Sequence, residues 1–205
     1  MPALREGASC CATMSSMGWD LQRFVEAQLR GSPWGDPYEA ALKELHRGRK
    51  TGHWMWYVFP QIQGLGSTDT ARYFAIASLD EARAYFAHPT LGARLVECAS
   101  ALLATEGRTA DEILGSVDTR KLRSSMTLFM RAAPEEPIFG QVLDRFFDGV
   151  ADERTDERLR DQATTVPDLD SHVIECAPSA LMSAHQMAPP RAARARPNSA
   201  TVACA

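Results

Sequence analysis

The stretch HWMWYVFPQIQGLGS, residues 53–67, holds the densest group of unusual residues in the chain, and the other segments are best understood around it. Its first half carries aromatic side chains on two adjoining helical faces: Trp54, Trp56, Tyr57 and Phe59. A short helix that is apolar nearly all round is buried on most sides. Pro60 disfavours helical backbone at the residue before it, so this helix should end near Phe59. Gly64 and Gly66 then predict a tight turn.

The polar residues of this stretch leave two interpretations open. In one, residues 53–67 form a core helix followed by a turn, and their role is structural. In the other, His53, Gln61 and the indole N–H groups of Trp54 and Trp56 surround a pocket. The second interpretation is reasonable because small-molecule sites combine apolar surface with a few convergent polar groups.

The composition is that of a globular protein and narrows the class of partner. With 205 residues, 45% of them hydrophobic and 23% charged, the chain has room for one domain of ordinary size with tails. The formal net charge of −4 argues against a nucleic-acid partner, because domains that bind nucleic acid are usually strongly basic. No apolar run approaches the roughly 20 residues of a membrane-spanning helix, so no membrane association is expected.

The five cysteines are odd in number and show no metal-binding spacing. Cys98 falls on the apolar face of a predicted helix, where it is expected to act as a small buried hydrophobe. The first residues lack the continuous apolar region of a secretory signal. These features predict a cytoplasmic protein in a reducing environment, and neither a metal nor a cofactor is expected.

Outside the central stretch, apolar residues recur at helical spacing and are separated by turn signals. They predict about eight helices and no strand. Five helix starts carry a capping signal: Asp20, Ser67 or Thr68, Ser78 with Glu81, Thr109 with Glu112, and Asp118. The fold class is therefore all-α, with a single compact multi-helix domain over residues 19–158. Residues 1–18 and 159–205 are expected to be disordered tails, because their composition cannot bury enough apolar surface.

No standard catalytic motif is present, so no catalytic residue is assigned. The polar residues that stand out are Arg72, just after the glycine turn, and Lys121 and Ser125, which share a face of the segment DTRKLRSSMTLF (118–129). If that face meets the turn, it presents a cation and a hydroxyl to an anionic group. The opposing interpretation pairs Lys121 with Asp118 and leaves the serines to helix packing. Asp148 and Asp152, with Thr155 nearby, could support acid/base chemistry, but they are expected to face water or cap the last turn.

Four segments resemble a bacterial all-helical family of unknown function: HWMWYVFPQIQGLGSTDTARYFAI, EARAYFAHPTLGARL, DTRKLRSSMTLF and FFDGVADERT. The resemblance covers residues 19–158 and excludes both tails. It implies a compact helical fold and a bacterial cytosolic setting, and it brings no activity. Members are sometimes labelled calpastatin, but nothing here resembles a disordered protease-inhibitor repeat.

Two functions therefore compete. In the first, the domain binds a small anionic ligand, such as a nucleotide-like or ADP-ribose-like molecule, with hydrolysis of that ligand as an extension. Its candidate binding residues are His53, Trp54, Trp56, Gln61, Arg72, Lys121 and Ser125. In the second, the domain is a non-enzymatic protein-interaction module whose aromatic stretch is only core. The first requires the polar side chains to converge on one pocket, whereas the second expects them scattered, with an exposed apolar patch elsewhere.

Overall fold

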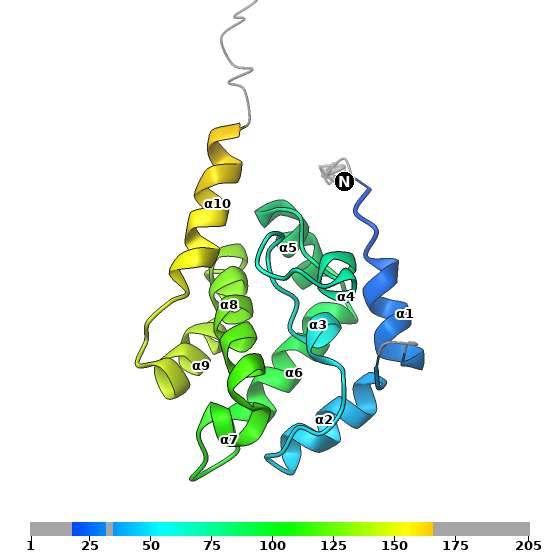
Figure 1. Ribbon diagram of the computed structural model, residues 1–205, viewed down its shortest axis with the longest axis vertical. Coiled ribbons are helices and arrows are strands. Elements are labelled where there is room, and N and C mark those ends of the chain that lie inside the picture. The colour runs from blue at the N-terminus through cyan, green and yellow to red at the C-terminus, as the bar shows by residue number, and fades with distance from the viewer. Residues whose placement is uncertain (1–17, 32–34, 166–205) are drawn as a thin grey trace, which may run out of the picture. The chain divides into compact units, whose positions relative to one another are not determined.

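The computed structural model describes residues 18–31 and 35–165, and the regular structure within them is helical (Figure 1). In chain order the helices are α1 (Gln22–Arg30), α2 (Tyr38–His46), α3 (Met55–Val58), α4 (Asp69–Tyr73), α5 (Leu79–Ala87), α6 (Leu91–Leu103), α7 (Ala110–Leu114), α8 (Ser116–Ala132), α9 (Ile138–Phe147) and α10 (Glu153–Thr165). No strand occurs in this part of the chain, so the predicted all-α class is confirmed.

The longest helix, α8, organises the packing. Helices α5, α7, α9 and α10 all contact it, and α10 runs beside it in Figure 1. The short α3 lies near the middle of the same view, in contact with α1 and α6. None of the helices in residues 18–31 and 35–165 is both long and apolar enough to cross a bilayer.

The central stretch is part of the core, as the structural interpretation predicts. Helix α3 ends at Val58, and Phe59, whose φ is −123° and ψ is 70°, leaves the helical region before Pro60. The side chains of Trp54 and Tyr57 are fully buried. The carbonyl of Tyr57 is not left unpaired, because the buried amide of Gln28 donates to it at 2.7 Å.

A continuous row of aromatic rings crosses the interior. Ring centroids are 5.0 Å apart between Phe24 and Tyr85, 5.3 Å between Tyr85 and Phe129, and 5.7 Å between Phe129 and Phe139. Each such pair adds about 0.5–1.5 kcal/mol beyond the burial of its surface. The row joins α1, α5, α8 and α9.

The glycine turn after α3 is fixed at its base. Ile76 donates its backbone N–H to the carbonyl of Gln61 at 2.9 Å, and Gln63 donates to the carbonyl of Ile76 at 2.8 Å. Gly64 has φ +92°, which favours glycine, and a Cβ on Gly66 would lie 2.5 Å from the Cβ of Ala71. The predicted tight turn is therefore confirmed.

Helix starts follow the predictions in part. Thr109 and Glu112 form the predicted capping box of α7. At α5 the box is incomplete: Ser78 accepts from the N–H of Glu81, but the carboxylate of Glu81 instead accepts from the N–H of Ala77 at 2.6 Å and pairs with Arg23 at 2.8 Å.

The caps predicted at Asp20 and Asp118 are wrong. Leu21 occupies the cap position of α1, and no side chain caps that helix. Helix α8 begins at Ser116, so Asp118 lies within its first turn, where its carboxylate pairs with lysines rather than with backbone N–H groups.

Helix α10 was not predicted, because its side chains are mostly polar. Asp152 caps it by accepting from the N–H of Thr155 at 3.0 Å, as one interpretation of that residue expects. Leu159 packs against the core, and Gln162 donates to the carbonyl of Ala77 at 2.7 Å. These tertiary contacts extend the ordered chain to Thr165, beyond the predicted end at residue 158. The remaining predicted tail, residues 166–205, and residues 1–17 lie outside the described part.

Candidate functional site

A cleft of about 530 Å³ opens between the central stretch, the glycine turn, α8 and the start of α10. Its lining comes from four segments: Trp56 and Gln61; Leu65, Gly66, Ser67, Thr68 and Ala71; Val117, Arg120, Lys121, Arg123 and Ser124; and Asp152 and Arg154. Volumes of about 300–1,000 Å³ are typical of small-molecule sites. The cleft therefore has the size for a small ligand.

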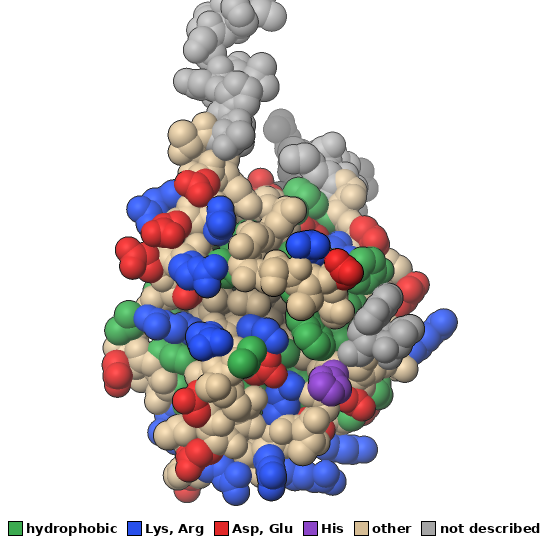
Figure 2. Space-filling model, in the orientation of Figure 1, with side chains coloured by type: hydrophobic (Ala, Val, Ile, Leu, Met, Phe, Trp, Pro, Cys, Tyr) green, Lys and Arg blue, Asp and Glu red, His purple; other side chains and the backbone are tan. Residues whose placement is uncertain are grey.

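Cationic side chains dominate the cleft. Arg120, Lys121 and Arg123 reach it from α8 and Arg154 from α10, against a single carboxylate, that of Asp152. Figure 2 shows Lys and Arg side chains gathered on the face that α8 and the start of α10 present in the view of Figure 1.

Two of these cations have no partner of their own. Within residues 18–31 and 35–165, neither Arg120 nor Arg154 makes an ion pair or a hydrogen bond. They contribute positive charge to the cleft, one from α8 and the other from α10.

Lys121 lies in the cleft but is paired. Its Nζ is 2.6 Å from Asp118, whose second oxygen lies 2.8 Å from Lys50, and it lies 4.9 Å from the centre of the Trp56 ring. Burial alone would raise the pKa of Asp118, but the hydrogen bonds from the two lysines outweigh it and hold the pKa below its usual value. The predicted pairing of Lys121 with Asp118 is thus confirmed, and it coexists with exposure to the cleft.

Arg123 holds the wall that carries Asp152. Its Nε and one terminal nitrogen donate to the carbonyls of Val150 and Ala151, at 2.8 and 3.0 Å. The next residue, Asp152, accepts from the hydroxyl of Ser124 at 3.0 Å. Arg123 and Ser124 of α8 therefore both hydrogen-bond to the segment that precedes α10.

Ser125 is placed differently from the expectation. It is fully buried, it does not line the cleft, and its hydroxyl has no hydrogen-bond partner among the described residues. Lys121 shares its helical face but carries a long side chain that reaches the cleft, whereas the short serine side chain stays inside. The neighbouring Ser124 faces the cleft instead.

His53, Trp54 and Arg72 also lie outside the cleft lining. His53 is exposed, and its backbone N–H donates to Asp36 at 3.0 Å. Trp54 is in the core. The side chain of Arg72 is 67% exposed and pairs with Asp69, because on the short helix α4 it is the preceding residue, Ala71, that faces the cleft. The structure therefore brings together Trp56, Gln61 and Lys121 out of the seven candidates.

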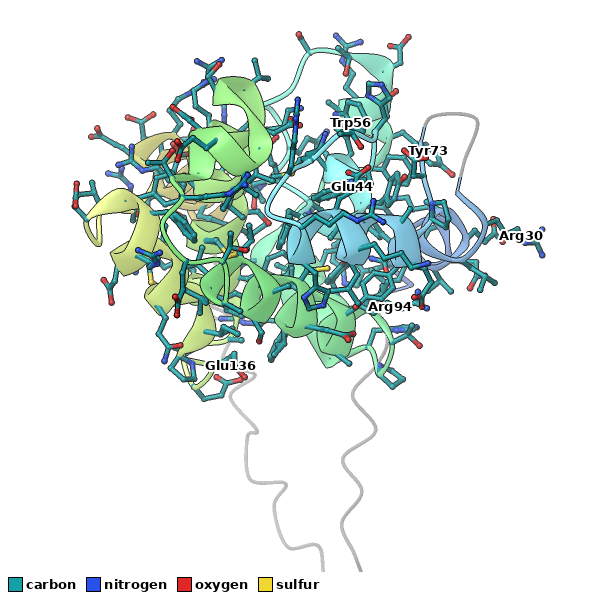
Figure 3. The ribbon with its side chains drawn as sticks, turned by 90° about the horizontal axis from the view of Figure 1, so that it is seen from below. Arg30, Glu44, Trp56, Tyr73, Arg94 and Glu136 are labelled. Carbon is teal, nitrogen blue, oxygen red and sulfur yellow. The ribbon has the colours of Figure 1, made fainter. Side chains whose placement is uncertain are left out.

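Glu44 on α2 positions the chain that enters the central stretch (Figure 3, where Glu44 and Trp56 are labelled). Its carboxylate accepts from the N–H of Thr51 at 2.9 Å, the N–H of Gly52 at 3.0 Å, the Thr51 hydroxyl, and the Trp54 indole N–H at 2.7 Å. Burial raises the pKa of Glu44, but these hydrogen bonds outweigh it and lower the pKa to about 2. Glu44 is therefore a fixed anion that holds Trp54 in place.

Sequence reasoning missed Arg120, Arg154 and Asp152 as cleft residues. The run Arg120, Lys121 and Arg123 was visible as a cluster of cations in the segment 118–129. Arg154 could not be placed without α10. Among residues 18–31 and 35–165, His, Cys, Asp and Glu side chains form no group of three or more that could hold a metal ion.

No curated protein matches the chain. A solved structure that matches is that of the conserved hypothetical protein Rv1873 from Mycobacterium tuberculosis, with 46% sequence identity and a TM-score of 0.64 over 69% of this chain and 96% of that one. The predicted resemblance to a bacterial helical family is confirmed, because residues 18–159 match the family described as "Protein of unknown function (DUF1810)". The chain belongs to that family.

Proposed function

We propose that this domain binds a small anionic ligand in the cleft between the glycine turn, α8 and α10. One observation carries the proposal: Arg120 and Arg154 line the same cleft from two different helices, and neither has an anionic partner in the described part of the chain. Elsewhere in that part, Arg23, Arg83 and Arg131 pair with carboxylates at 2.8–3.0 Å, while Arg30, Arg47 and Arg49 are exposed side chains outside this cleft. Two arginines that line one cleft from different helices without such partners favour an anion bound by both.

The wall of the cleft supports an organic anion more than a bare ion. Trp56, Leu65 and Val117 supply apolar surface, while Gln61 supplies an amide. An apolar wall beside a few convergent polar groups is the usual composition of a small-molecule site. A nucleotide-like ligand fits this description, with its charged group toward the arginines and its flat or apolar part toward Trp56.

Binding of nucleic acid fits less well. The cations are confined to one cleft, and the whole chain carries a formal net charge of −4. Affinity for a polymeric backbone comes from many phosphate contacts along a basic surface. A small ligand therefore accounts better for a local group of cations.

The protein-interaction alternative has less support. It expects a contiguous exposed apolar surface. Among the described residues, the large exposed hydrophobic side chains belong to four separate segments: Leu29, Tyr73, Val117 and Val150. No observation on these helices favours this second function.

To test this, the full chain is titrated with inorganic phosphate, nucleotides, ADP-ribose and sugar phosphates, and binding is measured by calorimetry and by tryptophan fluorescence. A ligand at 100 times its dissociation constant should raise the free energy of unfolding by about 2.7 kcal/mol. Arg120→Gln and Arg154→Gln should each weaken binding about tenfold, the loss typical of one charge-assisted hydrogen bond. Phosphate release, measured in the same samples, tests hydrolysis.

Arg30→Gln is the matched control. Arg30 is exposed in the last turn of α1, well away from Trp56 in Figure 3, and its replacement removes the same charge from the chain. Affinity should be unchanged in this variant. Equal weakening by Arg30→Gln and Arg120→Gln would mean that only net charge matters, and no binding of any anion by the folded parent would refute the proposal.

A further inference from the structure

Asp152 is an acid held firmly in a basic cleft. Its Oδ2 accepts three hydrogen bonds, from the Ser124 hydroxyl at 3.0 Å, the Thr155 N–H at 3.0 Å and the Thr155 hydroxyl at 2.7 Å. Its own backbone N–H donates to the Thr127 hydroxyl at 2.8 Å. The carboxylate therefore has a fixed position and cannot swing out of the cleft without breaking several bonds.

Capping of α10 explains only one of the two carboxylate oxygens. All the hydrogen bonds to the Asp152 side chain within the described residues end on Oδ2, and none reaches Oδ1. Arg120, Lys121 and Arg154 line the same cleft, yet none of them pairs with Asp152. Asp152 lines the cleft, and its Oδ1 is the carboxylate oxygen that has no hydrogen bond among the described residues, so it has acceptor capacity for a ligand.

An anion alone would be a poor match for this arrangement. A second negative charge beside Oδ1 would be repelled, whereas a hydroxyl would donate a charge-assisted hydrogen bond to it. The site therefore combines cations for one end of a ligand with an acceptor for a neutral donor on the same ligand.

Building on the proposed function, we infer that the ligand is an organic phosphate bearing a free hydroxyl group, with the phosphate held by Arg120 and Arg154 and the hydroxyl by Asp152 Oδ1. Phosphate fits better than carboxylate because a tetrahedral group has oxygens for cations that come from two different helices, while a planar carboxylate is satisfied by one arginine fork. Asp152 acts as the residue that determines specificity.

The experiment compares glycerol 3-phosphate with propyl phosphate, which has the same carbon chain and phosphate but no hydroxyl groups. Calorimetry on the full chain should show that glycerol 3-phosphate binds at least about tenfold more tightly, because Asp152 Oδ1 has no hydrogen-bond donor when the ligand lacks a hydroxyl. In Asp152→Asn both phosphates should bind more tightly, because a negative charge is gone from the cleft. The affinities for glycerol 3-phosphate and propyl phosphate should then be about equal. Asparagine caps helices as well as aspartate does, so α10 should be retained.

Asp148→Asn is the control, since Asp148 precedes the same helix, lies outside the cleft lining and has a left-handed backbone that asparagine also adopts. It should keep the parent's preference. Equal affinity of the two phosphates for the parent would overturn the inference while leaving an anion site, as would a preference that survives Asp152→Asn. Failure of both phosphates to bind, together with failure of inorganic phosphate, nucleotides, ADP-ribose and sugar phosphates, would overturn the proposed function as well. The parent's own ratio decides the matter if the variant is unstable.

Discussion

Replacement of Glu44 is expected to loosen the chain segment that leads into the central stretch. In Glu44→Ala, four donors lose their acceptor, and one of them, the indole N–H of the buried Trp54, has no ready replacement. An unsatisfied buried donor costs about 1–3 kcal/mol and a lost hydrogen bond to a charged group about 1.5–3 kcal/mol. Since the donors of Thr51 and Gly52 regain water, we expect a total loss of about 3–5 kcal/mol.

Glu44→Gln separates the charge from the hydrogen bonds. The amide oxygen can take the place of Oε2, which accepts three of the four bonds. The charge is lost, and the fall of the Glu44 pKa from 4.5 to about 2 corresponds to at most about 3 kcal/mol. Partial exposure of Glu44 reduces this, so about 2 kcal/mol is expected at pH 7.

The sign of the pH dependence follows from the lowered pKa. A carboxylate whose pKa is lower in the folded state stabilises the fold fully above its unfolded pKa, 4.5, and loses that effect as the pH falls toward 2. The difference between the parent and Glu44→Gln should therefore shrink to roughly half by pH 3.

Urea unfolding between pH 3 and pH 7 measures this difference, with Glu106→Gln as a control at an exposed turn. The control should change the free energy of unfolding by less than about 0.5 kcal/mol. A parent-minus-Glu44→Gln difference that stays constant over the whole pH range would refute the reasoning, because the charge would then contribute nothing.

Two further predictions concern packing and one buried hydroxyl. Gly92→Ala should destabilise the protein by more than about 2 kcal/mol, because the new Cβ would lie 1.9 Å from the carbonyl oxygen of Phe86. Gly140→Ala should stabilise it by about 0.5 kcal/mol, because nothing lies within 4 Å of a Cβ built there. Thermal unfolding compares the two variants, and similar effects would contradict the close contact at Gly92. Ser125→Ala should leave the free energy of unfolding unchanged or raise it by up to about 1 kcal/mol, since the buried hydroxyl has no partner in the described part of the chain. Ser124→Ala should lower it by about 1 kcal/mol, because a hydrogen bond to Asp152 is removed. The reverse order in urea unfolding would contradict these hydrogen-bonding roles of the two serines.

Local signals in the sequence predicted most of the fold correctly. The apolar period gave the helices up to α9, and the glycines at 64 and 66 gave the turn, because these features depend on neighbours in the chain. Helix α10 escaped prediction because its order depends on distant contacts, such as the bond from Gln162 to Ala77. The predicted cap at Asp118 failed because α8 already begins at Ser116, so Asp118 lies within the first turn and pairs with Lys121 and with the distant Lys50.

The candidate site shows the same division. Lys121 and Gln61 were recognised as polar residues in apolar segments, and both line the cleft. Arg154 depended on α10, so it was invisible to periodicity. Trp54 and Trp56 are only two residues apart and equally aromatic, yet one is fully buried and the other lines the cleft. That difference is set by which helices cover each face, and a single sequence does not contain it.

If Arg120 and Arg154 hold an anion between them, a crystal of the protein grown with tungstate should reveal it, because tungstate is a tetrahedral oxyanion whose tungsten atom gives an anomalous signal. We expect an anomalous peak in the cleft, with oxygens within hydrogen-bonding distance of both guanidinium groups, and loss of that peak in the Arg120→Gln, Arg154→Gln double variant. An empty cleft that is free of lattice contacts, beside tungstate bound elsewhere on the surface, would contradict it.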